Sequence, residues 1–393
     1  MRLSFQLQTP MPTAAEALYQ WHASGGAFER LCPPWQDIRV DNWTGGIKTS
    51  DQPAAEQFGD ISTGTRVYLK NQVGPFYMRI EAEHVAHKTG SYFIDEMRRG
   101  PFAYWRHTHS FIPSGESSSI LDDSVEFELP LDPFSRIAHG MATKEIRRMF
   151  DFRHWRTQRD IELHQRWQDG PRQSILIVGD GMFALHLGAF LKNGGHSVHH
   201  VATHAMNCRA HTVLDTLEPG HFAGTAFDSI VFCHRLEQGQ SSAVLRSVFQ
   251  AVSLQGVKVA LFLGEESLSH SEYTGQVRCI TLRIPSIWDG GYLCCPNRDP
   301  ATVISGWCAL DDLLGGIEEI VMNENWEGGY DWCAPSPIEI QALRTHGVGI
   351  RGLPFRVPHA VFKALKPSVL QHGTSVANVE YQWLEPRFFE TVF

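Results

Sequence analysis

Residues 174–184 have the sequence SILIVGDGMFA, and this stretch decides the fold of the second half of the chain. The run 174–178 is almost continuously apolar, as in a strand that a parallel sheet buries on both faces. Gly179 and Gly181 follow at once, and an apolar helical pattern then continues to about Asn193. A strand, a glycine turn and a helix in this order predict the start of a Rossmann-like α/β domain.

The segments downstream continue this alternation. Apolar runs predict further buried strands at 197–202, 229–233, 257–263 and 278–284, with a helical pattern near 243–252. Alternating strands and helices are typical of a parallel, doubly wound sheet. The turn-rich, aromatic residues after 332 predict a small C-terminal lobe.

The pattern before residue 174 is different. Short segments with a period of two predict strands at about 3–7, 65–70, 76–84, 91–96, 102–111 and 124–129. Helical patterns are expected at 14–21, at 27–35 and, much longer, at 136–167. A single long helix after an antiparallel meander can bury its apolar stripe by lying across the sheet. We therefore predict an α+β helix-grip fold for the first half.

The change of pattern sets the expected domain boundaries. At 393 residues the chain is too long for one ordinary core. We expect the helix-grip domain at 1–167, a linker at 168–173, the Rossmann-like domain at 174–332 and the lobe at 333–393.

Charge and cysteine content restrict the partners. A net charge of −9 argues against a nucleic acid or an anionic membrane. Basic residues gather on the long predicted helix, but acidic residues alternate with them, so we expect a solvated face at Arg147, Arg148, Arg153, Arg156 and Arg159. No apolar run suits a signal peptide or a membrane span. The eight cysteines contain no C-x-x-C pair, so we predict a cytoplasmic protein with reduced thiols and no metal centre.

Parts of both halves resemble a known family. The first half resembles the START/polyketide-cyclase-like (SRPBCC) domain at 25–35, Gly45-Gly46-Ile47, Ala82-Glu83-His84, Gly100-Pro101-Phe102, 105–111 and Phe152-Arg153-His154. In some bacteria this domain precedes an atypical short-chain dehydrogenase of the epimerase type, often labelled a cell-division inhibitor. The second half resembles that dehydrogenase at 179–184, Trp307, Asp311-Asp312 and Ala334-Pro335-Ser336-Pro337. The resemblance implies an NADP(H)-linked oxidoreductase of unspecified substrate.

The glycine turn matches a dinucleotide fingerprint, G-x-G-x-x-A. Its glycines let the backbone approach a pyrophosphate, which the helix N-terminus attracts. The region about twenty residues on lacks the usual Asp or Glu for a ribose and contains His204, which favours NADP over NAD. The candidate cofactor residues are Gly179, Gly181, Met182, Phe183, Ala184 and His204. The alternative is a tight turn kept for packing.

The catalytic residues of a short-chain dehydrogenase are missing. Such enzymes use a Tyr with a Lys four residues later. The residues four places after Tyr273, Tyr292, Tyr330 and Tyr381 are Val, Pro, Ala and Glu. The crossover 264–277 is also short, because about a dozen residues are needed merely to return to a parallel strand. Tyr273 remains the one weak candidate, and we predict an inactive dehydrogenase.

The strand expected at 102–111 carries two histidines on one face. Alternation places Trp105, His107, His109 and Phe111 together. A neighbouring strand adds Ile80, Ala82 and His84. If these faces point inward, they line a cavity for an amphipathic ligand. The predicted cavity residues are His84, Trp105, His107, His109 and Phe111.

Four interpretations of His107 and His109 stay open. They are ligand binding without chemistry, acid–base catalysis in a cyclase-like reaction, metal binding with His84 but without a nearby carboxylate, and hydrogen-bonded core histidines. The favoured function is a binding or scaffold protein, with a small amphipathic ligand or a protein as its partner. The alternatives are an NADP(H)-dependent oxidoreductase and a cyclase-like enzyme.

Overall fold

The structure is a computed structural model, and its described residues divide into two units, Met1–Arg166 and one that begins at Trp167. The described residues are 1–33, 36–44, 61–73, 76–130, 136–179, 181–202, 212–213, 221–222, 224–233, 247–252, 254, 256–263, 277–284, 287–288, 292–294, 303–304, 308–331, 338–339 and 349–350. The predicted linker and lobe boundaries stay predictions.

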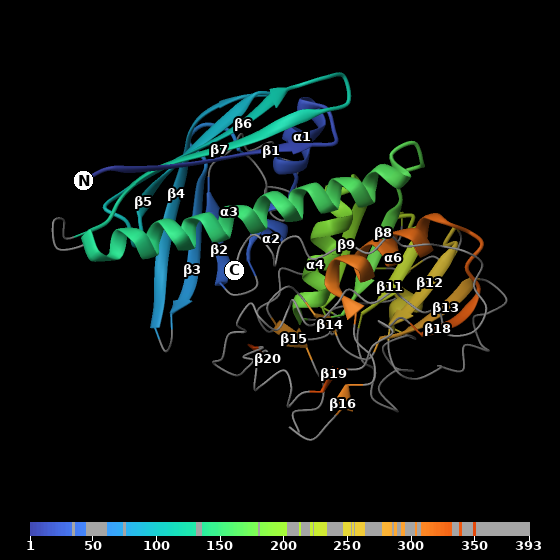
Figure 1. The fold of residues 1–393 in the computed structure, drawn as a ribbon. Helices are drawn as coiled ribbons and strands as arrows, with labels where there is room; N and C mark the ends of the chain where they lie inside the picture. The colour runs from blue at the N-terminus through green and yellow to red at the C-terminus, as the bar shows by residue number, and fades with distance from the viewer. Residues whose placement is uncertain are drawn as a thin grey trace. The chain divides into compact units, whose positions relative to one another are not determined.

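The first unit is built on an antiparallel sheet with the strand order β1-β7-β6-β5-β4-β3-β2 among its described residues (Figure 1). Its strands are β1 (Leu3–Met11), β2 (Asp37–Thr44), β3 (Arg66–Val73), β4 (Phe76–Lys88), β5 (Tyr92–Arg99), β6 (Tyr104–Pro113) and β7 (Ser119–Glu128). Six of these lie where period-two segments predict strands. β2 was not predicted.

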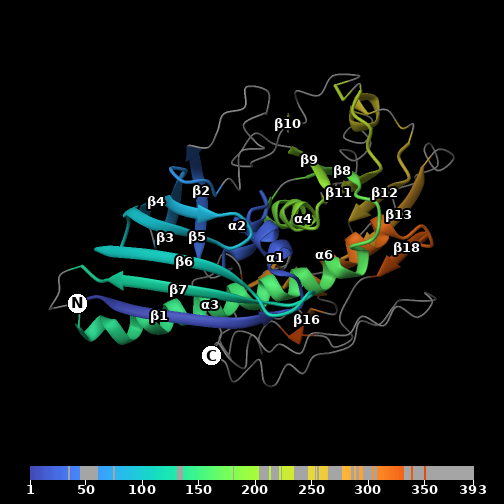
Figure 2. The ribbon, with the colours of Figure 1, turned by 90° about the horizontal axis from the view of Figure 1, so that it is seen from above.

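One long helix covers this sheet. The helices are α1 (Ala15–His22), α2 (Ala27–Leu31) and α3 (Arg136–His164), and a short 3₁₀ helix, Gln165–Trp167, follows. α3 runs along β1, as Figure 2 shows from above. Phe150 of α3 is fully buried against Phe5, Val125 and Phe127 of the sheet. An antiparallel sheet closed by one long helix is a helix-grip arrangement, as the sequence predicts.

The arginines of α3 do not form a wholly solvated face. Arg156 and Arg159 are buried, so this expectation is wrong for them. Nearby, Arg30 of α2 makes a two-pronged ion pair with Asp160 of α3, at 2.7 and 2.6 Å, and both side chains are fully buried. This pair ties α2 to α3.

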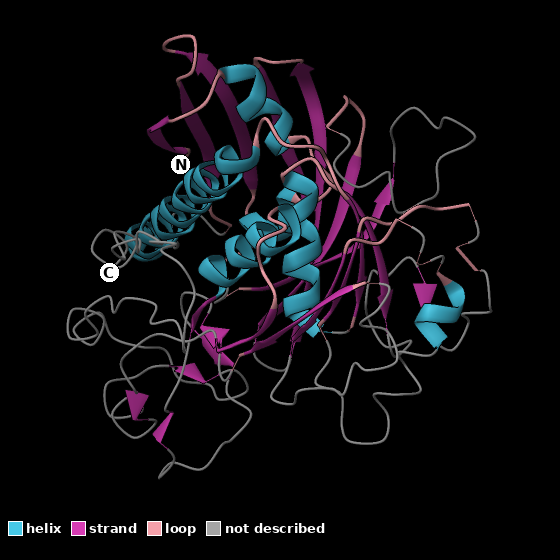
Figure 3. Cartoon of the chain, turned by 90° about the vertical axis from the view of Figure 1, so that its right-hand side faces the viewer, coloured by secondary structure: helices cyan, strands magenta, loops and turns pink. Residues whose placement is uncertain are grey.

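The second unit contains a parallel sheet, drawn as magenta strands in Figure 3. Its order among the described residues is β10-β9-β8-β11-β12-β13-β18. The strands are β8 (Ser174–Val178), β9 (Ser197–Ala202), β10 (Thr212–Val213), β11 (Ser229–Phe232), β12 (Val259–Leu263), β13 (Arg278–Arg283) and β18 (Gly328–Asp331). All the pairings are parallel. The predicted parallel sheet is confirmed, and its two edge strands, β10 and β18, are additions to the predicted strands.

Both faces of this sheet are covered, which explains the continuous apolar run at 175–178. Leu176 and Val178 join one core cluster with Val248 and Val252. On α4 (Gly181–Asn193), Gly188 lies close enough for an added Cβ to contact Ile177 at 3.6 Å. The other elements are β14 (Ile287–Trp288), β15 (Tyr292–Cys294), β16 (Val303–Ile304), β17 (Cys308–Ala309), α6 (Leu310–Met322), β19 (Ile338–Glu339) and β20 (Gly349–Ile350). Among the described residues, no helix has the length and apolar character needed to span a membrane.

Candidate functional site

His107 and His109 lie side by side on β6, with ring centroids 3.7 Å apart. Every second residue from His107 to Phe111 is buried, which confirms the predicted alternation. Phe150 of α3 packs edge-on against His107 with ring centroids 4.9 Å apart. Both imidazoles therefore lie in the interior between the sheet and the long helix.

Strand register brings a carboxylate beside each histidine. Asp95 on β5 pairs with His107, and Asp123 on β7 pairs with His109. His107 Nε2 donates a hydrogen bond of 3.0 Å to Asp123 Oδ1. His109 Nδ1 lies 2.8 Å from the same oxygen, in ion-pair contact but not aligned for a hydrogen bond. The expectation that no carboxylate lies near these histidines is therefore wrong.

Asp95 approaches the opposite sides of the two rings. Its Oδ1 lies 3.5 Å from His107 Nδ1 and 3.4 Å from His109 Nε2. The Asp95 side chain is 17% exposed, against 3% for His107 and 9% for His109. Asp95 is therefore the member of this group that is most accessible to solvent.

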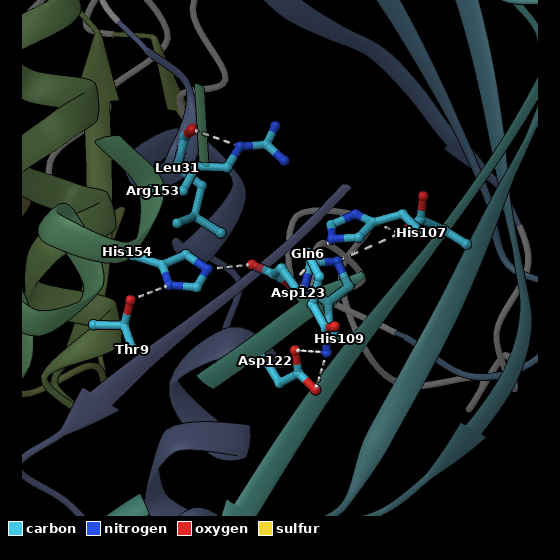
Figure 4. Close-up of polar contacts among 10 residues, drawn as sticks. Gln6, Thr9, Leu31, His107, His109, Asp122, Asp123, Arg153 and His154 are labelled. Atoms are coloured by element: carbon cyan, nitrogen blue, oxygen red, sulfur yellow. Dashed lines mark hydrogen bonds and ion pairs between the residues drawn. The ribbon is translucent and has the colours of Figure 1, made fainter. Parts of the chain in front are cut away.

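The long helix completes the group (Figure 4). His154 of α3 donates from Nε2 to Asp123 Oδ2 at 2.8 Å, and its Nδ1 lies 2.8 Å from the Thr9 hydroxyl on β1. An ionised carboxylate accepts through both oxygens, so Asp123 can serve several imidazoles at once. We refer to Asp95, His107, His109, Asp123 and His154 as the histidine–aspartate cluster.

Burial and charge move the pKa values of the cluster apart. Burial lowers the pKa of His107, and the neighbouring His109 lowers it further. Burial also opposes the charge of His109, but Asp123 and Asp95 outweigh it and raise its pKa to about 9. The imidazoles lower the pKa of Asp95 to about 2 against its burial and hold that of Asp123 well below its usual range. At neutral pH a cationic His109 thus stands beside a neutral His107.

Aromatic rings surround the cluster. Phe93 of β5 stacks on His109 with ring centroids 4.0 Å apart. His22 of α1 lies 4.9 Å from Phe111 and 6.1 Å from His109, centroid to centroid. Burial, helped by the charge of His109, lowers the pKa of His22 to about 3, so His22 is neutral. The charged groups are thus enclosed by apolar side chains.

The remaining predicted cavity residues take different places. The expectation that His84 lies on the strand next to His107 is wrong, because β5 separates β4 from β6. His84 instead lies opposite Asp95 of β5. Trp105 packs against Phe102 and Phe127, at the end of β6 away from Phe111. Trp105 still meets His107 edge-on, with ring centroids 6.5 Å apart. Phe111 lies on the other side of His109, where both residues contact Phe93.

The glycine turn of the second unit has the backbone expected of its sequence. Gly179 and Gly181 have φ values of 150° and 83°, in the region that favours glycine. The Gly179 amide donates to Val201 O at 2.9 Å, and His200 Nε2 donates to Gly179 O at 2.7 Å. Ala184 is fully buried, as a small residue at the third fingerprint position should be. Residues of β9 thus hold the turn in place through one backbone and one side-chain hydrogen bond to Gly179.

The other predicted residues of this unit have no shared site among the described residues. Met182 and Phe183 belong to the first turn of α4, where Phe183 is partly buried. His204 and Tyr273 lie outside the described residues. Tyr330 is on β18, and its hydroxyl donates to the carbonyl oxygen of Glu327 at 2.6 Å.

Comparisons with known proteins agree with the fold. No family model matches the sequence, and no curated protein matches it. A nucleoside-diphosphate sugar epimerase from Corynebacterium glutamicum superposes with a TM-score of 0.61 at 18% identity, over 92% of this chain and 86% of that one. This likeness shows a shared fold across both units.

Two further structures match a smaller share of the chain. A truncated norcoclaurine synthase from Thalictrum flavum has a TM-score of 0.32 at 13% identity, over 41% of this chain and 94% of that one. An aromatase/cyclase from a Streptomyces species has a TM-score of 0.34 at 9% identity, over 44% and 100%.

Proposed function

We propose that this chain is a small-molecule-binding protein that works through its helix-grip unit, and that its parallel-sheet unit carries out no dehydrogenase reaction. The histidine–aspartate cluster is the observation that supports the first part. Buried carboxylates and imidazoles are costly, and apolar side chains would fill this space at a lower cost in folding free energy. Groups with pKa values moved apart in this way are typical of functional sites.

The surroundings favour an amphipathic ligand. Its apolar body would pack on the aromatic rings that enclose the cluster, among them Phe93 and Phe111. A ligand oxygen would bond to His107 or His109. An ordered polar group in an apolar surrounding fixes the orientation of such a ligand.

The dye 1-anilinonaphthalene-8-sulfonate tests this proposal, because it combines an aromatic body with an anionic group. We expect saturable binding at one site per chain and a loss of affinity of about tenfold in His109→Gln, the size of one hydrogen bond to a charged group. Glu318→Gln, at a buried pair of the other unit, is the matched control and keeps the affinity. No saturable binding by the wild type, or equal binding by His109→Gln, would contradict the proposal.

The second part rests on the missing Tyr and Lys pair, the short crossover 264–277 and the local engagement of Tyr330. Incubation with NADPH and a panel of aldehydes and ketones should give no NADPH oxidation above the protein-free rate. Calorimetry with NADPH and NADH reports binding separately from turnover. NADPH-dependent reduction of any of these carbonyl compounds would refute the proposal.

The pair His107 and His109 also favours a second candidate function, acid–base catalysis in the helix-grip unit. Neighbouring titratable groups with opposite pKa shifts provide a base and an acid. The probe is 5-nitrobenzisoxazole, which opens to a coloured phenolate when a base removes one proton. Turnover that both His107→Gln and His109→Gln abolish would support catalysis, and turnover unchanged in both would exclude it for this pair.

A further inference from the structure

Three possible ligand atoms of the cluster lie close to one another. Asp95 Oδ1 lies 3.5 Å from His107 Nδ1 and 3.4 Å from His109 Nε2, and ligand atoms of the three residues all lie within 4.8 Å of one another. Two ligand atoms at about 2.1 Å from a tetrahedral ion are about 3.4 Å apart. We propose that Asp95, His107 and His109 bind a divalent transition-metal ion. This replaces the sequence-based expectation of no metal centre.

The far nitrogens of the same two rings face a second carboxylate. His107 Nε2 donates to Asp123 Oδ1, and His109 Nδ1 lies 2.8 Å from that oxygen. In metal sites a ligating imidazole commonly directs its other nitrogen to a carboxylate, which sets the tautomer and the ring orientation. With the proton of His107 on Nε2, its Nδ1 offers a lone pair toward Asp95. The arrangement of two imidazoles between Asp95 and Asp123 matches that pattern.

Asp123 is itself held in place from outside the pair. His154 Nε2 donates to Asp123 Oδ2, and the Thr9 hydroxyl contacts His154 Nδ1. These two contacts come from α3 and from β1, the edge strand next to β7, so the helix and that edge of the sheet both help to fix Asp123. Asp123 is therefore a positioning residue in the proposal, not a ligand.

Charge and donor type select the ion. Binding of the ion at His109 Nε2 would release the proton from that nitrogen to solvent, and the two carboxylates, with both imidazoles then neutral, balance a divalent cation. One carboxylate and two imidazoles suit zinc, cobalt, nickel, copper or iron, whereas calcium and magnesium prefer oxygen ligands in larger number. Three protein ligands leave a fourth position open, as in catalytic zinc sites. Asp95 is the most exposed of the three proposed ligands, so solvent would reach the ion from the side of Asp95.

The inference concerns the site of the proposed function but does not require an organic ligand. Full-length protein treated with a chelator and dialysed is titrated with Zn²⁺ by calorimetry. A parallel titration with Co²⁺ follows the visible absorption that distinguishes four-coordinate from six-coordinate Co²⁺. We expect one equivalent of either ion per chain, a four-coordinate Co²⁺ spectrum, and no competition by millimolar Mg²⁺.

Variants locate the site. Asp95→Asn removes the anionic ligand and should lower the Zn²⁺ affinity by more than a hundredfold, whereas Asp95→His supplies a substitute ligand and should retain binding. Asp123→Asn should lower it by about 10- to 100-fold, the usual effect of losing a carboxylate that orients ligands. The matched control is Asp122→Asn, next in sequence but bonded to Gln6 on the exposed side, with unchanged affinity.

The outcomes separate the two proposals. Absence of stoichiometric Zn²⁺ and Co²⁺ binding by the wild type overturns the metal site, whatever the variants do. Binding that survives Asp95→Asn at full affinity overturns it as well, because the ion then binds elsewhere. The dye titration on the chelator-treated protein reports the ligand site independently, so dye binding without metal binding rejects only this inference.

Discussion

The two units of the chain bury polar side chains in contrasting ways. In the parallel-sheet unit, Nδ1 of His196 accepts a hydrogen bond of 3.1 Å from the backbone N–H of Gln173. Nε2 of the same ring donates a hydrogen bond of 3.2 Å to Glu318. These two hydrogen bonds connect the residue before β8 to α6 through one imidazole and one carboxylate. In the helix-grip unit, side chains from β5, β6, β7 and α3 converge on one point. Convergence of several titratable groups, more than burial of any one, therefore distinguishes the candidate site from a structural tie.

The largest expected effect is the removal of the carboxylate at the centre of the cluster. Asp123→Ala leaves His107 and His154 without their acceptor in a buried surrounding, and a broken buried pair costs about 3–5 kcal/mol. The free energy of unfolding of the helix-grip unit, measured in urea by tryptophan fluorescence, should fall by that amount. Asp122→Asn is the control and should stay within about 0.5 kcal/mol.

Removing the His196–Glu318 hydrogen bond of the second unit should cost less free energy of unfolding than Asp123→Ala. Glu318→Ala removes one acceptor of His196, and a buried donor left unsatisfied costs about 2 kcal/mol. Urea unfolding of the second unit measures the loss. A loss equal to that of Asp123→Ala would remove the energetic distinction between the two units.

His22 makes the helix-grip unit sensitive to acid. His22 is neutral in the folded protein, with a pKa of about 3, and His109, Asp123 and His154 are the charged or titratable groups that face it. The unfolded chain binds a proton near pH 6.5 and the folded chain does not, so stability falls as pH decreases below 6.5. The contribution is about 1.4 kcal/mol per pH unit.

Comparison with His22→Phe isolates this contribution. Phenylalanine keeps the ring packing against Phe111 and has no proton to bind. The wild type should lose more stability than the variant between pH 6 and pH 5, by about 1.4 kcal/mol in urea titrations at each pH. Parallel losses in the two proteins would show that His22 is charged or exposed when folded.

The smallest effect concerns the glycine turn. Gly181→Ala meets open space but forces an L side chain to a φ of 83°, which costs about 1 kcal/mol. Thermal unfolding of the second unit should detect this loss. Gly188→Ala, in the middle of α4 with a Cβ contact of 3.6 Å to Ile177, is the comparison and should be neutral or stabilising.

The sequence predicts which residues share a face better than it predicts which strands meet. Alternation along β6 is enough to place His107 and His109 together, because successive side chains point to opposite faces. It does not reveal Asp95 and Asp123, since their positions depend on the register of β5 and β7 against β6. A β-strand pairing shifted by one residue would send every side chain to the other face.

Three strands of the two large sheets escaped prediction for a related reason. β2, β10 and β18 are edge strands, and an edge strand has one neighbour and a weak apolar pattern. The burial of Arg156 and Arg159 on α3 was missed because a charge pattern does not show which side chains a basic residue will meet in the fold. The same holds for Arg30 of α2, whose burial its ion pair with Asp160 makes tolerable.

The sequence by itself determined the fold classes, the glycine turn at 179–181 and the absence of a Tyr and Lys pair, because these depend on local periodicity, on positive φ values and on residue identity. Only the tertiary structure decided that Asp95, His107, His109, Asp123 and His154 form one cluster. These residues come from three strands and a helix spread over some sixty positions, and their meeting depends on strand register and on where the long helix lies. Electrostatic coupling falls off with distance, so the chemistry of the site exists only once those elements have packed.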